Sequence, residues 1–383
     1  MPKIIRITTV PISLNILLKG QLKYMQNNGF ELIAASASGP EIKEFCKREE
    51  IPHKIINFTR TLSPIKDLKA LYQLILLIRK ERPEIVHTHT PKAGLLGMLA
   101  AKICGVPVRM HTIAGMPLME VDGFLKYVLQ FTESITYACA HFVYPNSLQL
   151  KKWVETHFES YKGKVKIIGD GSTNGISLEY FSSSEELIDN SIKLRNLMHI
   201  KEHQVSFIFV GRLVRDKGIN ELVKAFGLLD NEYHLILVGA YEDERDPIKA
   251  ATKDLIDSNP RIHHVGFQSD VRPYLLAADI FVFPSYREGF PNVVLQASAM
   301  RLPSIVSDIN GNNEIIEDRK NGWIVPVKNV NALSSAMQSL GENAELREKM
   351  AKQARAALIE KYEQHYVWDL LLREYETLLS GKS

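Results

Sequence analysis

The chain has 383 residues, more than the roughly 250–300 at which a single hydrophobic core stops growing, so two domains are expected. Its 45% hydrophobic and 24% charged residues exclude a disordered or low-complexity chain. The net charge is +3, but residues 1–200 carry 25 basic and 18 acidic side chains, whereas the remainder carries 22 and 26. A basic first half would suit anionic lipid or a diphosphate-bearing substrate, and ordinary surface solvation explains the excess equally well.

The cysteines and the apolar segments indicate the compartment. Cys46, Cys104 and Cys139 are far apart and have no nearby histidine ligands, so we expect buried thiols in a reducing environment. The chain starts directly with a strand pattern and shows no signal peptide. Its apolar runs are shorter than the roughly 18 residues of a spanning helix. The sequence therefore predicts a cytoplasmic protein, and no nucleic-acid partner is expected.

The first half alternates strand and helix patterns, which predicts a parallel sheet covered by helices. The strand patterns cover residues 4–10, 31–35, 55–58, 85–89 and 108–112, and the helical patterns cover residues 14–27, 42–49, 64–81 and 94–104. A stretch at 123–131 is weakly basic and partly aromatic; it could touch a membrane, although a buried helix face is the favoured interpretation.

A change of pattern follows between residues 165 and 190. Residues 169–174 imitate a dinucleotide-binding fingerprint but lack its third glycine and the helix behind it, so we interpret them as a hinge, followed by a polar linker at 182–190. Six further strand patterns cover residues 206–210, 234–238, 263–265, 280–283, 303–306 and 323–325.

These patterns predict the domain organisation. Residues 1–180 are expected to form one domain and residues 181–362 a second, and an apolar helix within 363–383 could pack back across the first domain. Both domains are expected to be doubly wound, Rossmann-like α/β sheets that face a central cleft, with ligands at the carboxyl ends of the strands.

The strand pattern at 206–210 runs into a loop that carries two cations, Arg212 and Lys217. A diphosphate leaving group gains negative charge as its glycosidic bond breaks, so a fixed guanidinium and ammonium would stabilise the transition state more than the ground state. The alternative is that both are solvated loop charges.

A second anion site is predicted after the strand pattern at 280–283. Gly289 permits a close backbone approach, Pro291 can occupy the first helical position, and the amides of Asn292 and Val293 would then point outward. A helix N-terminus of this kind binds phosphate or sugar oxygens.

Two side chains of the same segment could contact the sugar and the ribose. Glu288, just before the helix, could accept hydrogen bonds from sugar hydroxyls or stabilise oxocarbenium-like charge, whereas the alternative role is a partner of the helix dipole. Gln296, two turns into the helix, could reach ribose hydroxyls.

Together these motifs resemble glycosyltransferase family 4 over nearly the whole chain, and the subgroup that builds capsular, O-antigen or protein-linked glycans on undecaprenyl diphosphate is the most similar. The resemblance rests on Gly211-Arg212…Lys217-Gly218, His264-Val265-Gly266-Phe267, Glu288-Gly289-Phe290-Pro291-Asn292, the segment 86–94, His111-Thr112 and Asn174-Gly175-Ile176.

The resemblance implies a retaining glycosyltransferase of the GT-B type. It would transfer a hexose or N-acetylhexosamine from a nucleoside-diphosphate sugar, UDP in preference to GDP, to a lipid-diphosphate-linked glycan. It would need no divalent metal or other cofactor, and the sequence has no Asp-x-Asp pair. The enzyme could be peripheral on the inner face of the plasma membrane, and its oligomeric state is not predicted.

The resemblance also implies acceptor binding for residues 1–180, nucleotide-sugar binding for residues 181–362, and roles for individual residues. Glu288 and His111 are the catalytic candidates, with His111 touching the donor sugar. The remaining candidates are Arg212, Lys217, Asn292 and Val293 for the donor diphosphate; Gly266, Phe267, Gly289, Phe290 and Gln296 for donor sugar, base and ribose; and Ser13, Asn15 and Lys92 on the acceptor side. A core or loop position is the alternative for His111, and plain solvation is the alternative for Lys92. His87 and His89 are expected to be structural or cleft-lining.

Three positions depart from the family pattern. Gln296 stands where the E-x7-E motif ends in glutamate, which turns a charge-assisted hydrogen bond into a neutral one. The loop at 8–15 lacks the paired glycines of many members, and Ser177 stands where many have aspartate. A nucleotide-sugar epimerase or a phosphorylase of the same fold, or a non-catalytic nucleotide-binding relative, stays the alternative.

Overall fold

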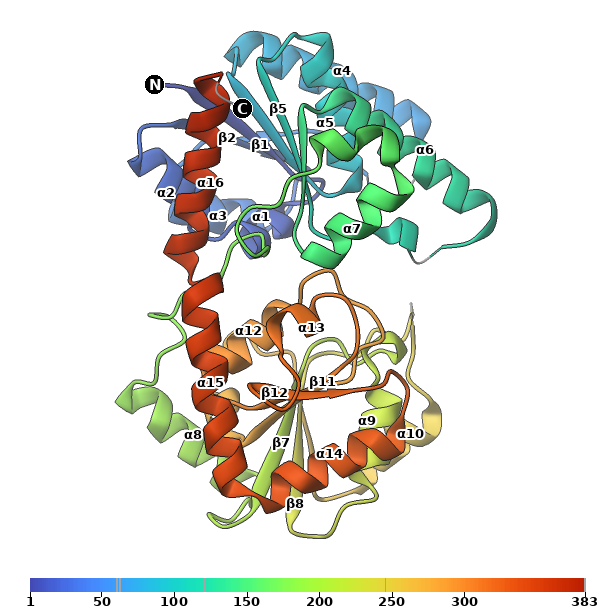
Figure 1. The fold of residues 1–383 in the computed structure, drawn as a ribbon, viewed down its shortest axis with the longest axis vertical. Helices are drawn as coiled ribbons and strands as arrows, with labels where there is room; N and C mark the ends of the chain where they lie inside the picture. Colours follow the sequence, from blue (N-terminus) through green and yellow to red (C-terminus); the bar gives the residue numbers. More distant parts are fainter. Residues whose placement is uncertain (60, 62, 120, 245, 382–383) are drawn as a thin grey trace. The chain divides into compact units, whose positions relative to one another are not determined.

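The computed structural model describes residues 1–59, 61, 63–119, 121–244 and 246–381. Contacts divide the chain into two compact units, each with its own parallel sheet (Figure 1). Unit 1 contains Met1–Gly175 and the C-terminal segment from Gln364, and unit 2 contains Ile176–Glu363. The sequence placed the division at residue 180, and residues 382–383 of its C-terminal segment lie outside the described residues.

Unit 1 is built on a six-stranded parallel sheet in the order β3-β2-β1-β4-β5-β6. The strands are β1 (Lys3–Ile7), β2 (Glu31–Ser36), β3 (His53–Ile55), β4 (Ile85–His89), β5 (Val108–Ile113) and β6 (Phe142–Pro145). Because the order reverses direction between β1 and β4, the carboxyl ends of these two strands form the switch point at which open α/β sheets bind ligands.

Alternating side chains of the sheet bury both of its faces. Ile5 and Ile7 of β1 join the core under α4, α5, α6 and α7, whereas Ile4 joins the core under α1, α2, α3 and α16 (Figure 1). The helices are α1 (Pro11–Leu17), α2 (Gln21–Asn27), α3 (Glu41–Glu49), α4 (Pro64–Glu81), α5 (Pro91–Ile103), α6 (Gly123–Cys139), α7 (Leu148–His157) and α16 (Gln364–Leu379), with short 3-10 turns η1 (Pro117–Met119) and η2 (Glu159–Lys164).

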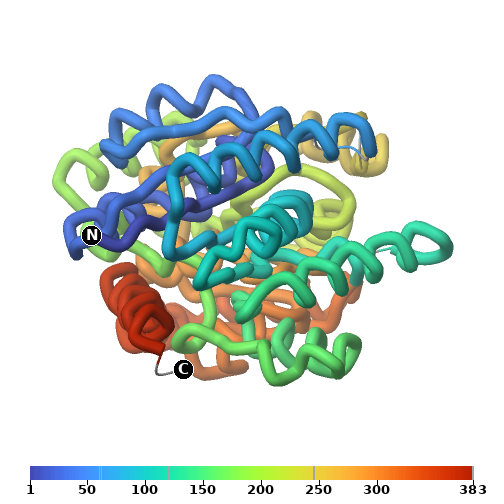
Figure 2. The backbone as a smooth tube through the Cα atoms, turned by 90° about the horizontal axis from the view of Figure 1, so that it is seen from above, coloured from blue at the N-terminus to red at the C-terminus, as the bar shows by residue number. Residues whose placement is uncertain are grey.

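The C-terminal helix α16 belongs to unit 1. Trp368, Leu371 and Tyr375 are buried in the core that also holds Leu22 and Met25 of α2. Figures 1 and 2 both show the red helix beside the blue N-terminal segment. The helix pattern at 14–27 is wrong in one respect: it is two helices, because Gly20 has a φ of 81° and a Cβ there would lie 2.7 Å from the Trp368 ring.

Unit 2 repeats the architecture with the order β12-β11-β10-β7-β8-β9. Its strands are β7 (Val205–Val210), β8 (Tyr233–Val238), β9 (Ile262–Gly266), β10 (Ile280–Phe283), β11 (Ser304–Ser307) and β12 (Gly322–Val325). Its helical segments are α8 (Glu185–Leu197), η3 (Arg215–Lys217), α9 (Ile219–Phe226), α10 (Ala250–Ser258), α11 (Arg272–Ala277), α12 (Asn292–Ala299), α13 (Asn312–Ile315), α14 (Val330–Glu342) and α15 (Ala344–Tyr362). The switch point of this sheet lies between β7 and β10, the strands that precede the two predicted anion loops.

The segment between the two sheets is where the sequence predicted a hinge and a linker. Residues 169–174, expected as a hinge, lie in unit 1 directly before its boundary with unit 2, and Asn174 Oδ1 accepts hydrogen bonds from Trp368 Nε1 at 2.7 Å and Gln21 Nε2 at 3.2 Å. The predicted linker at 182–190 runs into α8, whose first turn is capped by the Ser184 side chain.

The three cysteines differ in burial. Cys139 is buried, but Cys46 and Cys104 are only half-buried, so the expectation of three buried thiols is wrong for two of them.

Over the described ranges, every helix is too short or too polar to cross a bilayer.

Glu133 of α6 gives a pH-dependent prediction. Its side chain is buried, and loss of hydration raises its pKa to about 7. A carboxyl whose folded pKa is raised contributes stability below its unfolded pKa near 4.5, and this contribution is lost as the pH rises toward 7. We expect Glu133→Gln to raise the free energy of unfolding by about 3 kcal/mol at alkaline pH and to leave it nearly unchanged near pH 4.5. Urea titrations at both pH values measure the difference, and an equal effect at both would contradict a buried, shifted carboxyl.

Candidate active site

The two predicted anion loops of unit 2 meet at the switch point of its sheet. Gly218 has a φ of 72°, and a Cβ there would lie 2.2 Å from the Pro284 carbonyl oxygen, so only glycine lets the loop after β7 reach the loop after β10. The amide of Tyr286 donates to the Asp216 carbonyl at 2.8 Å and joins the loops further.

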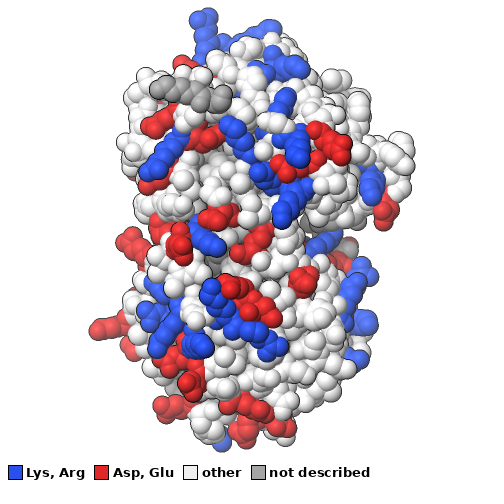
Figure 3. Space-filling model, viewed as in Figure 1, with Lys and Arg blue, Asp and Glu red and all other residues white. Residues whose placement is uncertain are grey.

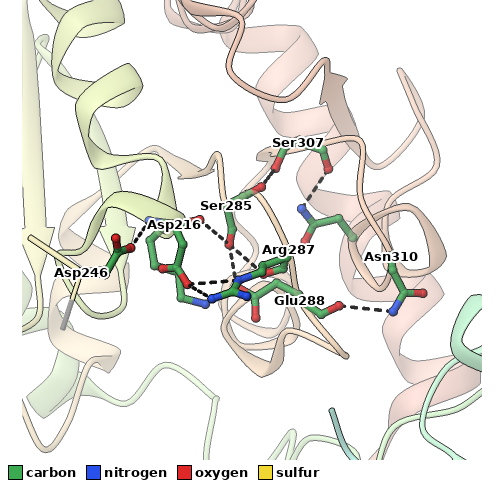
Figure 4. Close-up of polar contacts among 9 residues, drawn as sticks. Asp216, Asp246, Ser285, Arg287, Glu288, Ser307 and Asn310 are labelled. Atoms are coloured by element: carbon green, nitrogen blue, oxygen red, sulfur yellow. Dashed lines mark hydrogen bonds and ion pairs between the residues drawn. The ribbon is translucent and has the colours of Figure 1, made fainter. Parts of the chain in front are cut away.

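An ion pair between Lys217 and Glu288 forms the centre of this contact. The two side chains are 15% and 16% exposed, and Ser285 Oγ donates to Glu288 Oε1 at 2.9 Å. Figure 4 shows Ser285 and Glu288 side by side in the loop after β10. The fold therefore joins two residues that the sequence singled out separately, and each is oriented by the other.

The neighbouring cations also have acidic partners. Arg212 Nη1 donates to Glu242 Oε2 at 2.7 Å, Arg215 pairs with Asp246 at 3.0 Å, and Arg287 donates to Asp216 at 2.9 Å (Figure 4). The Arg212 side chain is 49% exposed. Exposed ion pairs contribute at most about 1 kcal/mol, so an incoming diphosphate can replace the Glu242 carboxylate at little cost.

The start of α12 supplies backbone donors, although Pro291 is the N-cap and not the first helical residue that the sequence predicted. No side chain caps this end, and the first amide with a backbone partner is that of Val294, bonded to the Pro291 carbonyl at 3.0 Å. Within the part of the chain that the structure describes, the amides of Asn292 and Val293 have no such partner. They are free to bind an anion at the positive end of the helix dipole.

A third loop, after β11, supports the other two, and the sequence did not single it out. Asn310 Nδ2 donates to the carbonyl oxygens of Glu288 at 3.2 Å and Gly289 at 3.1 Å, and the Ser307 hydroxyl donates to the Ser285 carbonyl (Figure 4). Strand order could have indicated this loop, because β11 is the neighbour of β10 and its carboxyl end lies at the same edge of the sheet.

The candidates for the base, the ribose and the sugar ring are spread over three elements. Phe267 follows β9 and is 76% exposed, which leaves its ring free to stack, and Gly266 has a φ of 70° with open space beside it. Phe290 is buried against Tyr362, 5.3 Å between ring centres, so only its backbone faces the loop. Gln296 is half-buried on α12.

In unit 1, His111 lies on β5 and is 1% exposed. Its Nδ1 is 2.8 Å from Thr88 Oγ1, and a Cβ on Gly94 would lie 2.5 Å from its ring, so the imidazole packs closely against α5. Burial lowers the pKa of His111 to about 4, so the ring is neutral at physiological pH. It can take part in hydrogen bonds but cannot supply a positive charge.

Two acceptor-side candidates are already bonded within unit 1. Lys92 Nζ contacts Asp67 Oδ1 at 2.8 Å and the Thr61 carbonyl at 2.6 Å, so its charge is neutralised. Asn15 Oδ1 accepts from Arg48 at 3.0 Å. Ser13 is half-buried in the first turn of α1. The contacts of Lys92 and Asn15 do not involve its side chain, so it stays a candidate for the acceptor side.

The switch point of unit 1 holds two threonines that the sequence did not single out. Thr90 has a φ of 71°, a strained conformation for a β-branched residue. Its Oγ1 accepts from the Thr9 amide at 3.1 Å and lies 2.8 Å from Thr9 Oγ1. Strain of this kind is concentrated at functional sites, and here it lies where β1 and β4 end.

A buried polar network ties α16 to this sheet. The fully buried Arg6 donates to Tyr375 Oη and Gln21 Oε1, each at 2.7 Å, and to His89 Nε2 at 2.8 Å. Arginine is a donor only, so His89 is the neutral imidazole with its proton on Nδ1. Burial and the Arg6 charge hold the pKa values of His87 and His89 well below their usual range, which fits the structural role expected for both.

Similarity to known proteins extends over the chain. The family model for Glycosyl transferases group 1 matches residues 191–357, and that for Glycosyltransferase Family 4 matches residues 18–173. The chain is 32% identical over 382 residues to the capsular polysaccharide biosynthesis glycosyltransferase CapM of Staphylococcus aureus, with 98% of this chain and 97% of CapM covered. This chain is a glycosyltransferase of family 4.

Other relatives of this glycosyltransferase support the assignment. It is 27% identical over 324 residues to the UDP-Gal:alpha-D-GlcNAc-diphosphoundecaprenol alpha-1,3-galactosyltransferase of Escherichia coli, covering 83% of this chain and 81% of that one. Anabaena Alr3699/HepE in complex with UDP has the same fold, with a TM-score of 0.80, 18% identity and coverage of 99% and 100%. The GT-B fold expected from the sequence is confirmed.

The described part of this glycosyltransferase was compared with the side-chain groups that bind metal ions in proteins. Within those ranges, no group of three histidine, cysteine, aspartate or glutamate side chains lies close enough to hold an ion. The charged groups at the unit 2 switch point are instead the paired cations and acids around Lys217 and Glu288.

Proposed function

We propose that this glycosyltransferase transfers a hexose or N-acetylhexosamine from a UDP-sugar to a lipid-diphosphate-linked glycan precursor, with retention of anomeric configuration. The observation that carries the proposal is the ion pair of Lys217 and Glu288 at the unit 2 switch point, in the same pair of loops as Arg212 and the helix start at Asn292 and Val293. The anion-binding groups match the diphosphate of a sugar nucleotide, and the carboxylate beside them matches its sugar.

Each group has a defined task in the proposed reaction. Arg212, Lys217 and the amides of α12 bind the diphosphate, and the charge that develops on it as the C1–O bond breaks strengthens these contacts. Glu288 stabilises positive charge on the sugar ring. The acceptor hydroxyl forms the new bond to C1 on the same face and gives its proton to the departing phosphate oxygen. No cofactor is required in this scheme.

The donor and the acceptor class are proposed from named relatives and from fold. The Escherichia coli relative carries UDP-galactose and diphosphoundecaprenol in its name, and the Anabaena structure contains UDP. A lipid-linked acceptor is reached at the membrane surface, and we propose a peripheral position of the enzyme on the cytoplasmic face.

Nucleotide binding tests the proposal directly. We expect UDP to bind the full chain with higher affinity than GDP in calorimetry, and a nucleotide-soaked crystal to place its two phosphates between the 211–218 loop and the start of α12. Transfer of labelled sugar from UDP-sugars should require a lipid-diphosphate acceptor. Diphosphate density elsewhere, or labelled product formed without any acceptor, would overturn the assignment.

The pairing of Arg212 with Glu242 gives a further prediction. Glu242→Gln removes the carboxylate that competes with the diphosphate, so we expect the KM for the donor to fall by about two- to fivefold, as the loss of an exposed ion pair allows. The kcat should stay unchanged. Glu317→Gln, which removes the exposed carboxylate paired with Lys320 in the same unit, is the matched control. A raised donor KM in Glu242→Gln would mean that the pair positions Arg212 instead of competing with the ligand.

A further inference from the structure

The outer face of α4 exposes an apolar stripe that the proposed reaction does not use. Ile65, Leu68, Tyr72 and Leu76 are 84%, 66%, 62% and 47% exposed. Their spacing of three, four and four residues places them in one line along the helix. The opposite side of α4 is buried through Ala70, Leu74 and Ile78, so the stripe is additional to the helix's own core contact.

Basic side chains flank this stripe, and the acidic side chains of α4 itself are both paired. Four exposed cations lie on the same side of the helix: Lys66, Lys69, Arg79 and Lys80. The two acids of α4 are bound to lysines, Asp67 to Lys92 at 2.8 Å and Glu81 to Lys3 at 3.2 Å. A helix with an apolar line between exposed cations is the pattern of a helix that lies in the interface of an anionic bilayer.

The N-terminal end of this face also borders a hollow suited to a phosphate group. The hollow has a volume of about 320 Å³ and is lined by Lys66 and Lys69 together with the chain segments that follow β2 and β3. These segments are at the carboxyl edge of the sheet, where Ser13 and Lys92 also lie. A phosphate-bearing headgroup could therefore bind here while its acyl chains extend from the apolar stripe.

Helix α6 presents a second apolar surface on the same side of the sheet. Phe124, Tyr127 and Phe131 are 83%, 72% and 67% exposed, so the favoured sequence interpretation of a buried helix face at 123–131 is wrong. Figures 1 and 2 both show the start of α6 projecting from unit 1. In Figure 3 this projection is white at its tip and carries blue and red atoms below it, and Lys126 forms an exposed ion pair with Asp122 at the start of the helix. Helix α5 packs between α4 and α6, and all three begin at the carboxyl edge.

We infer that the outer face of α4, with the aromatic start of α6, binds the surface of an anionic lipid bilayer. Charge complementarity decides between occupants: a second copy of the chain would set the α4 cations against like charges, whereas anionic headgroups neutralise them. The inference deepens the proposed function and depends on it for the lipid-linked acceptor, but the surface itself can be tested without donor or acceptor.

Vesicle flotation of the full chain tests the inference. We expect the wild type to float with vesicles that contain phosphatidylglycerol and not with pure phosphatidylcholine, and salt to weaken the binding. Lys66→Gln and Lys69→Gln should each lower partitioning about fivefold, and Leu68→Ser with Tyr72→Ser about tenfold. The matched controls are in α8 of unit 2, Lys193→Gln and the exposed pair Ile192→Ser with Leu197→Ser, and they should float as the wild type does.

The outcomes separate this inference from the proposed function. Absence of flotation for the wild type, or flotation of the α4 variants equal to the wild type, overturns it. A wild-type dimer in light scattering that becomes monomeric in Leu68→Ser with Tyr72→Ser also overturns it and identifies an interface between copies. Transfer to a short, water-soluble acceptor should persist in Leu68→Ser with Tyr72→Ser, so loss of bilayer binding with retained transfer in this variant supports the surface. Absence of transfer by the wild type would contradict the proposed function alone.

Discussion

Glu288→Gln is expected to lower kcat for sugar transfer by about 10³-fold, because it replaces a preorganised carboxylate with a neutral side chain of the same size. The carboxylate is held by Ser285 Oγ at 2.9 Å and by Lys217, so it does not have to reorient when charge develops on the sugar. Its effect is therefore expected in the transition state and much less in donor binding. Initial rates over a range of UDP-sugar concentrations separate the two effects.

Two measurements keep this expectation testable. UDP affinity from calorimetry should change only a few-fold, and the melting temperature should stay near that of the wild type. Glu317→Gln, which removes the exposed partner of Lys320 in the same unit, is the control for loss of a carboxylate and should leave kcat unchanged. Transfer by Glu288→Gln at close to the wild-type rate would place the catalytic centre elsewhere.

Much of the fold could be predicted because it depends on local periodicity. The continuous apolar runs that become β7, β8 and β10 are buried on both faces and read as parallel strands without knowledge of their partners. Strand order then follows from the alternation with helices, and the carboxyl-edge rule brings Arg212, Lys217 and Glu288 to one switch point. The candidate site was thus predictable at the level of loops.

The partners within those loops could not be predicted, because they depend on contacts between distant segments. Nothing in the local sequence shows that Asn310 holds the Glu288 backbone or that Lys92 is neutralised by Asp67. The break of the 14–27 helix at Gly20 has the same cause, since it is Trp368 of α16 that occupies the space beside it.

The aromatic start of α6 was misjudged for a different reason. Phe124, Tyr127 and Phe131 recur at helical spacing, and this periodicity indicates which residues share a face. It does not indicate whether another element covers that face. In the structure it is the C-terminal part of α6, through Tyr137 and Cys139, that enters the core, whereas the start of the helix stays exposed.

Lys217→Met is expected to lower kcat/KM for the donor by about 10³-fold, more than Arg212→Ala, for which about tenfold is expected and mainly through KM. The difference follows from burial: the Lys217 side chain is 15% exposed and fixed between Glu288 and the Phe283 ring, whereas Arg212 is 49% exposed and already shares an exposed pair. A cation that is held in place and partly dehydrated stabilises developing phosphate charge more than one that must first be ordered.

A double-mutant cycle tests whether Lys217 and Glu288 act as a unit. Since the two side chains orient each other, the variant with both Lys217→Met and Glu288→Gln should be less impaired than the product of the single effects, with a coupling of about 1–3 kcal/mol. Arg212 and Glu288 share no hydrogen bond or ion pair in the structure, so the effects of Arg212→Ala and Glu288→Gln on kcat/KM should combine almost multiplicatively. Strictly multiplicative effects in the first pair would mean that the ion pair of the free enzyme is dissolved before the transition state, and that the ammonium and the carboxylate then act on the diphosphate and the sugar independently.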